Sequence, residues 1–143
     1  MEALGRLFNV LSLGDAKYVN LRDCGGVTFM CYLAAAAGDT WTLQEATTAA
    51  GGGATNLVTI TRFHTCTGDG TDAWTLRTQA AAATVVTAAA ATQNAMVVEV
   101  EEEELSAGFS YVKLTSTGAG LVTAVTRDLR VARKPSNLPV ISA

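Results

Sequence analysis

Short runs of β-branched and aromatic residues, separated by turns that contain glycine, recur along most of this chain. The runs at residues 26–33, 57–63 and 109–116 show the pattern clearly. Such runs are typical of β-strands, and turns that return this often favour a sandwich or a barrel. The sequence therefore predicts an all-β fold of about seven to nine strands, a β-sandwich or barrel-like domain.

Residues 1–14 have a different periodicity. Four apolar residues recur at the spacing of one helical face, and Gly14 follows them as a signal for the end of a helix. A helix this short needs a partner surface in order to persist. We therefore expect a short N-terminal helical arm with an apolar face formed by Leu4, Leu7, Phe8 and Leu11.

The end of the chain holds both prolines, Pro135 and Pro139. Proline cannot donate a hydrogen bond to a neighbouring strand, so this segment is expected to be an extended arm rather than part of a sheet. The expected organisation is a helical arm at residues 1–14, a β domain at residues 15–133 and an extended C-terminal arm at residues 134–143.

The chain has 143 residues, which suits one domain with arms. Its net charge of −3 argues against a nucleic-acid partner, because proteins that bind phosphate backbones concentrate lysine and arginine. No apolar run reaches the roughly 18 residues of a membrane-spanning helix, and the first residues lack the pattern of a signal peptide. We expect a protein that is made in the cytoplasm and binds neither nucleic acid nor a membrane.

The most acidic stretch is VVEVEEEEL at residues 97–105. In a strand, Glu99 and Glu101 share one face while Val98 and Val100 share the other. Adjacent glutamates then point to opposite faces and rarely hold one ion, and the spacing of a calcium loop is absent. The stretch is interpreted as the solvated acidic end of a strand, with a charged contact to a partner as the alternative, rather than as a metal site.

Few other residues could carry chemistry. His64 and Cys66 would share one face of a strand, but no further residue completes a nucleophilic set. The segment TGDGTD, which holds Asp69 and Asp72, is interpreted as a turn because the rest of a calcium-binding loop is missing. We assign no catalytic, cofactor-binding or metal-binding residue, and we expect a protein that is not an enzyme and has no cofactor.

The motif Asp-X-Trp-Thr-Leu occurs twice, at residues 39–43 and 72–76. Two copies cannot form a solenoid, so the pair reflects either an old duplication or a coincidence of strand chemistry, and we favour the second. Each copy is expected to place its tryptophan and leucine on one face of a strand. We interpret Trp41 and Trp74 as core anchors rather than as platforms for stacking bases or sugars.

The chain has three cysteines, Cys24, Cys31 and Cys66. An odd number at irregular spacing is a poor framework for disulfides. We expect all three to be reduced and mostly buried.

Several motifs in the C-terminal half occur in a characteristic order. A VVEV strand is followed by a leucine and GFSYVKL, and a hydrophobic strand then ends in DLRVARKPSNLP. Together with the upstream segment VTFMCYLAAAAGDTWTLQEAT, this order resembles small virion proteins of tailed bacteriophages, especially those of actinobacterial hosts. The resemblance covers roughly residues 17–139.

The resemblance implies a capsid decoration (cement) protein of the phage head. Proteins of this kind bind the major capsid protein and each other, often as homotrimers, and the resemblance supplies no catalytic residues. The alternatives are another virion component, such as a tail-tube or head–tail connector protein, and a carbohydrate-binding β-sandwich that uses Trp41 or Trp74.

Two arms on a compact β domain are suited to reach neighbouring subunits. The residues expected at such contacts are Leu4, Leu7, Phe8, Leu11, Arg130, Arg133, Lys134, Pro135 and Leu138.

Overall fold

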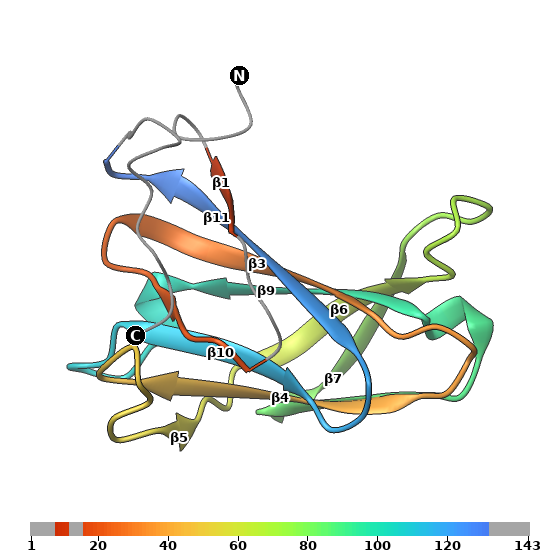
Figure 1. The fold of residues 1–143 in the computed structure, drawn as a ribbon, viewed down its shortest axis with the longest axis horizontal. Helices are drawn as coiled ribbons and strands as arrows, with labels where there is room; N and C mark the ends of the chain where they lie inside the picture. Colours follow the sequence, from red (N-terminus) through yellow and green to blue (C-terminus); the bar gives the residue numbers. More distant parts are fainter. Residues whose placement is uncertain (1–7, 12–15, 132–143) are drawn as a thin grey trace.

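The computed structural model describes the backbone of residues 8–11 and all of residues 16–131, which form two antiparallel β-sheets packed face to face (Figure 1). The all-β fold predicted from the sequence is confirmed. In the described part, only η1 and η2 are helical, and each has three residues. The elements in chain order are β1 (Phe8–Leu11), β2 (Val19–Asn20), β3 (Cys24–Tyr32), β4 (Asp39–Ala46), β5 (Thr55–Asn56), β6 (Ile60–Cys66), β7 (Thr75–Ala82), β8 (Thr84–Thr87), η1 (Ala91–Gln93), β9 (Ala95–Glu101), η2 (Glu102–Glu104), β10 (Tyr111–Ser116) and β11 (Leu121–Leu129).

Sheet A has six strands in the order β1-β11-β3-β9-β6-β7. Sheet B has the order β2-β10-β4-β5, and β8 pairs with the first half of β4. The chain passes from sheet A to sheet B through Ala83, the residue between β7 and β8. This crossing closes one side of the sandwich.

The core lies between the sheets and is built from alternate residues of each strand. In β9, Met96, Val98 and Val100 are buried while Glu99 is exposed, so the predicted alternation is confirmed. Burial of one large apolar side chain contributes about 1.5 to 3 kcal/mol. The largest fully buried side chains are Trp41, Phe29, Leu21, Leu43, Met96, Leu114, Val19, Val27, Val85, Val98, Val100 and Val112.

Trp41 is the largest residue of this core, with 1% of its surface exposed. Its indole N–H donates to the hydroxyl oxygen of Thr87 at 3.3 Å, which satisfies the only polar group of the ring. The β10–β11 turn passes close above the ring. A Cβ atom at Gly120 would lie 2.2 Å from Trp41 Cη2, so this close approach requires glycine.

The expected N-terminal helix is wrong where the structure describes it. Residues 8–11 form β1, which pairs with β11 in the register Phe8↔Arg127 to Leu11↔Ala124. The physical reason is that a helix of this length is marginal alone, whereas a strand here covers the otherwise unpaired edge of β11. Leu4 and Leu7 lie outside the described residues.

β11 ends at Leu129, and Asp128 just before it has a φ of 53°, in the left-handed region. The pairing with β3 skips Asp128, because a residue in that conformation does not continue the ladder. The predicted C-terminal arm at residues 134–143 lies outside the described residues.

Candidate functional site

The outer face of sheet A carries a patch of exposed apolar side chains. β3 contributes Met30 and Tyr32, β11 contributes Leu121 opposite Tyr32, and the start of β7 contributes Leu76 with Trp74 directly before it. The exposed fractions are 68% for Leu121, 54% for Leu76, 48% for Trp74, 47% for Met30 and 40% for Tyr32. We call these five residues the apolar face.

The surface between these five residues is also largely apolar. Ala95 of β9 lies opposite Tyr32, and Cys66 of β6 lies opposite Ala95. In the next row, His64 lies between Val97 and Leu76. The register therefore joins the apolar face into one continuous surface across five strands. The prediction that His64 and Cys66 share a face is confirmed.

Exposed large apolar residues are concentrated on this surface. Of the eight that the described residues contain, five belong to the apolar face. The other three are Val58 between β5 and β6, Val86 in β8 and Val131 after β11. Single exposed apolar residues are ordinary on soluble proteins, whereas a contiguous patch marks an interaction site.

The turn after β6 positions Trp74 on the apolar face. Asp69 accepts a hydrogen bond from the Thr71 hydroxyl at 2.6 Å, and Asp72 accepts one from the Thr67 hydroxyl at 2.6 Å. The hydroxyls of Thr67 and Thr71 lower the pKa of Asp69 to about 2. The aspartates of TGDGTD thus accept hydrogen bonds from residues of the turn itself, which confirms the predicted turn.

Gly68 places this turn against the apolar face. Its φ is +77°, a conformation that favours glycine, and a Cβ atom there would lie 2.9 Å from Tyr32 Cε2. The turn therefore packs on Tyr32 and fixes one end of the apolar face.

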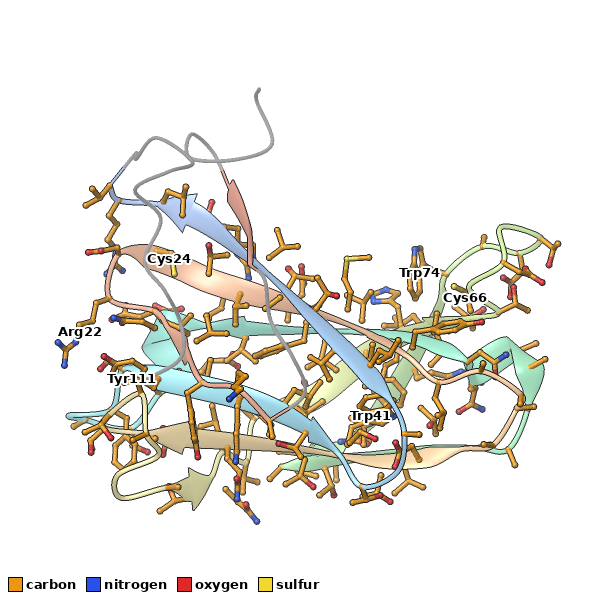
Figure 2. All side chains as sticks on the ribbon, in the orientation of Figure 1. Arg22, Cys24, Trp41, Cys66, Trp74 and Tyr111 are labelled. Carbon is orange, nitrogen blue, oxygen red and sulfur yellow. The ribbon has the colours of Figure 1, made fainter. Side chains whose placement is uncertain are left out.

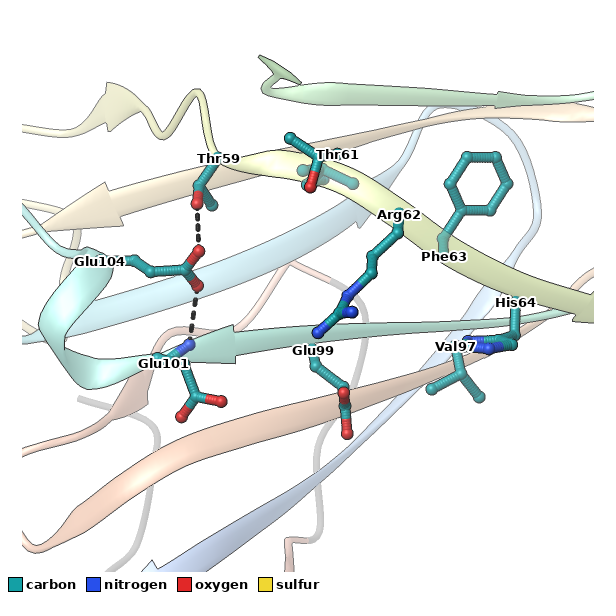
Figure 3. Close-up of a pocket in the computed structure, with 10 residues that line it drawn as sticks. Thr59, Thr61, Arg62, Phe63, His64, Val97, Glu99, Glu101 and Glu104 are labelled. Carbon is teal, nitrogen blue, oxygen red and sulfur yellow. Dashed lines mark hydrogen bonds between the residues drawn. The ribbon is translucent and has the colours of Figure 1, made fainter. Parts of the chain in front are cut away.

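A small polar pocket borders the apolar face at the far ends of β6 and β9. In Figure 3, Arg62 and Glu99 line it from neighbouring strands. Its volume is about 100 Å³, well below the few hundred Å³ of a typical small-molecule site. The pocket is lined by Thr59, Ile60, Thr61, Arg62, Phe63, His64, Val97, Glu99, Glu101 and Glu104.

The glutamate run ends β9 and forms η2, and three of its carboxylates bond to neighbouring protein groups. Glu101 pairs with Arg127, and Glu102 pairs with Arg130 at 2.9 Å. Glu104 accepts the backbone N–H of Glu101 at 2.8 Å and the hydroxyl of Thr59, which caps η2 (Figure 3). The predicted acidic end of a strand is confirmed. Among the described residues, no group of three or more histidine, cysteine, aspartate or glutamate side chains could hold a metal ion.

Two buried carboxylates flank Trp41 and Leu43 on the inward face of β4. At one end, Asp39 accepts hydrogen bonds from the Thr117 hydroxyl at 2.7 Å and the Gly118 N–H at 3.1 Å. At the other end, Glu45 accepts the N–H of Ser106 at 2.8 Å. Buried carboxylates are candidates for catalysis. Each of these two, however, already accepts hydrogen bonds from a loop and holds that loop in place.

The hydrogen bonds around Asp39 also set its ionisation. Burial alone would raise the pKa of Asp39, but bonds from the Ser116 and Thr117 hydroxyls and from the N–H groups of Thr40 and Gly118 outweigh it, and the pKa lies below its ordinary value. Asp39 is therefore a charged structural anchor at neutral pH.

The three cysteines are buried and free of disulfides, as predicted. Cys24 and Cys31 are seven positions apart on β3, which separates them by about 20 Å and excludes a bond between them. Burial raises the pKa of the Cys24 thiol to about 11, so this thiol is protonated and unreactive at neutral pH.

The outer face of sheet B has a different character. Lys113 lies 4.8 Å from the ring centroid of Tyr18, and Arg22 lies 5.9 Å from that of Tyr111. Figure 2 labels Arg22 and Tyr111. Cations stacked on aromatic rings cover apolar surface with charge. This face therefore does not present an apolar surface like that of sheet A.

The predicted interface residues fall into three groups. Phe8 and Leu11 have their backbone in β1. Arg130 is exposed and its guanidinium is paired with Glu102. The rest lie outside the described residues: Leu4, Leu7, Arg133, Lys134, Pro135 and Leu138.

The two copies of the repeated motif have opposite environments. Trp41 is a core anchor as predicted, with Leu43 buried beside it, but the prediction is wrong for Trp74, which is about half exposed, as is Leu76. Both tryptophans are labelled in Figure 2. The reason is position: β4 is an inner strand of sheet B, whereas β7 is the last strand of sheet A. The sequence did contain one signal of the apolar face. Residues 27–33 are apolar at nearly every position, so both faces of that strand are apolar.

Comparison of the chain with family models, with curated protein sequences and with solved structures gave no significant match of any kind. Among the described residues, no helix is of sufficient length and hydrophobicity to traverse a lipid bilayer.

Proposed function

We propose that this chain is a structural component of a tailed-phage virion, a capsid decoration protein that binds the outside of the head shell and works as an oligomer. The observation that carries the proposal is the apolar face, a contiguous patch on the outer side of sheet A that suits a contact within an oligomer. The resemblance of residues 17–139 to small virion proteins supplies the class of assembly. The major capsid protein is the proposed partner.

The polar clusters of the described residues support a structural role. Asp39, Glu45, Glu101 and Glu104 all bond to groups of their own chain. A site for acid–base or nucleophilic chemistry needs polar groups that are free to meet a substrate. These carboxylates instead hold loops and strand ends in place, which suits a particle component.

The arms remain a prediction, and the structure changes how it is tested. Deleting residues 1–13 would remove β1 and uncover β11, so loss of assembly in that variant would not isolate an arm contact. Deleting residues 134–143 is the cleaner change. We expect this deletion to leave the β domain folded and to weaken attachment to the shell.

The test is electron microscopy of purified particles with and without the protein. Density on the outer shell that disappears with the protein supports decoration. Density in the tail or at the connector supports the other virion roles and contradicts decoration. Absence from the particle contradicts every virion role.

A carbohydrate-binding module is the second candidate, because Trp74 is exposed on a sheet surface and Trp41 is not. Stacking of a sugar on Trp74 would change its fluorescence. Titration with a panel of soluble polysaccharides, with Trp74→Ala as control, tests this candidate. No change in tryptophan fluorescence with any polysaccharide of the panel contradicts it.

A further inference from the structure

The apolar face is large enough to form the centre of a stable protein interface. Large side chains of this kind cover about 150 to 250 Å² each, so the exposed fractions of the five residues amount to roughly 500 Å². This area lies in the upper part of the range for the largest apolar patch on a typical monomer, which is about 300 to 600 Å². One partner of a standard interface contributes about 800 Å², of which the apolar face would supply more than half.

The charges along its border are balanced. Arg62 and Glu99 line the same pocket from neighbouring strands, and Arg127 pairs with Glu101 in the next row. A surface with both signs side by side is complementary to another copy of itself, whereas a surface for a strongly charged partner carries one sign in excess. The apolar face itself contains no carboxylate or ammonium group, so two copies with a net charge of −3 can meet there without opposing charges.

The edge strand of sheet A beside the apolar face, β7, is not open to pairing with a strand of another chain. The register passes from Ile60↔Ala82 to Arg62↔Thr78, so residues 79–81 of β7 bulge opposite Thr61 alone. Gln79 holds the bulge by donating to the carbonyl oxygens of Ile60 and Thr84. Bulges of this kind bend an edge strand away from further pairing. Contact through the face, rather than through the edge of the sheet, is therefore favoured.

We propose that the apolar face is a self-association surface, covered in solution by a second copy of this chain. The copies form a closed oligomer in which Trp74 and Leu121 are buried at the contact. This proposal goes beyond the virion role and does not rest on it, because it concerns the purified chain alone.

The experiment is sedimentation of the full chain over a range of concentrations. Leu121→Asp and Leu76→Asp place a charge in the face. Val86→Asp is the matched control, because Val86 is also 68% exposed, lies in β8 of sheet B and gives the same change in net charge. We expect the unmodified chain and Val86→Asp to associate equally, and both face variants to weaken association at least about tenfold.

A second measurement tests the location of the contact. Acrylamide quenching reports the exposure of Trp74, because Trp41 is buried in the core of the β domain. Quenching should fall as the concentration of the unmodified chain rises and should stay high in Leu121→Asp. A chain that stays monomeric overturns the proposal, as does association that both face variants retain. Far-ultraviolet circular dichroism of each variant confirms that the β domain is folded. If Leu121→Asp does not fold, Leu76→Asp decides the test.

Discussion

The hydroxyl of Thr117 donates a hydrogen bond of 2.7 Å to the carboxylate of Asp39, 78 residues earlier in the chain. The bond ties the turn after β10 to the start of β4. Gly118 N–H and the Ser116 hydroxyl reach the same carboxylate. One side chain therefore fixes the turn that lies over Trp41.

Asp39→Asn should destabilise the fold by about 1 to 3 kcal/mol, because the new amide presents a donor to groups that are themselves donors. The matched control is Asp72→Asn, the same position in the second copy of the motif, where the carboxylate is exposed and serves one turn. Its cost should be smaller, within about 1 kcal/mol. Urea unfolding measures both, and equal losses would contradict an anchoring role for Asp39.

The unfolding free energy should fall in acid, in part through Asp39. Its pKa is lowered in the folded state, so its contribution is complete above the unfolded pKa of about 3.9 and is lost as pH falls through the folded value. Urea unfolding between about pH 7 and about pH 3 should show a shallower decline in Asp39→Asn than in the unmodified chain. Parallel curves would show that Asp39 does not contribute.

The two tryptophans should differ sharply in their effect on stability. Trp41→Phe leaves a cavity and removes the bond to Thr87, and we expect a loss of about 1 to 3 kcal/mol. Trp74→Phe, at an exposed position in the same motif, should change stability by no more than about 0.5 kcal/mol. The comparison requires a concentration at which the chain is monomeric. A large loss in Trp74→Phe would mean that its side chain packs within its own monomer.

The glutamate run should not bind metal ions specifically. Glu101, Glu102 and Glu104 already bond to Arg127, Arg130 and the η2 backbone, and a divalent ion would have to displace these partners. Calorimetry with calcium, magnesium and zinc should show only weak, nonspecific heats. A micromolar site that disappears in Glu101→Gln or Glu103→Gln would refute the prediction.

Local sequence patterns predicted the fold well where the structure of a segment depends on its own residues and not on a distant partner strand. The alternation in β9 and the turn at Gly68 follow from residue chemistry alone, and both are confirmed. Residues 8–11 were predicted wrongly because the partner that makes them a strand, β11, lies more than a hundred residues away. Periodicity cannot report a partner that distant.

The apolar face was missed for a related reason. Trp74 and Trp41 have the same local sequence, and only the order of strands in the two sheets separates a buried residue from an exposed one. The residues of the face come from β3, β7 and β11, so no single stretch of sequence contains it. The buried role of Asp39 was hidden in the same way, since its donors Thr117 and Gly118 lie 78 and 79 residues later in the chain.

The strand order also governs how the chain folds during synthesis. Within the part of the chain that the structure describes, β3 pairs only with β9 and β11, β2 only with β10, and β1 only with β11. Closing such long loops slows folding and leaves apolar segments uncovered meanwhile. A ribosome halted before residue 95 therefore holds a nascent chain in which the first three strands still lack their partner strands, and their apolar residues stay uncovered until the last third of the chain is made.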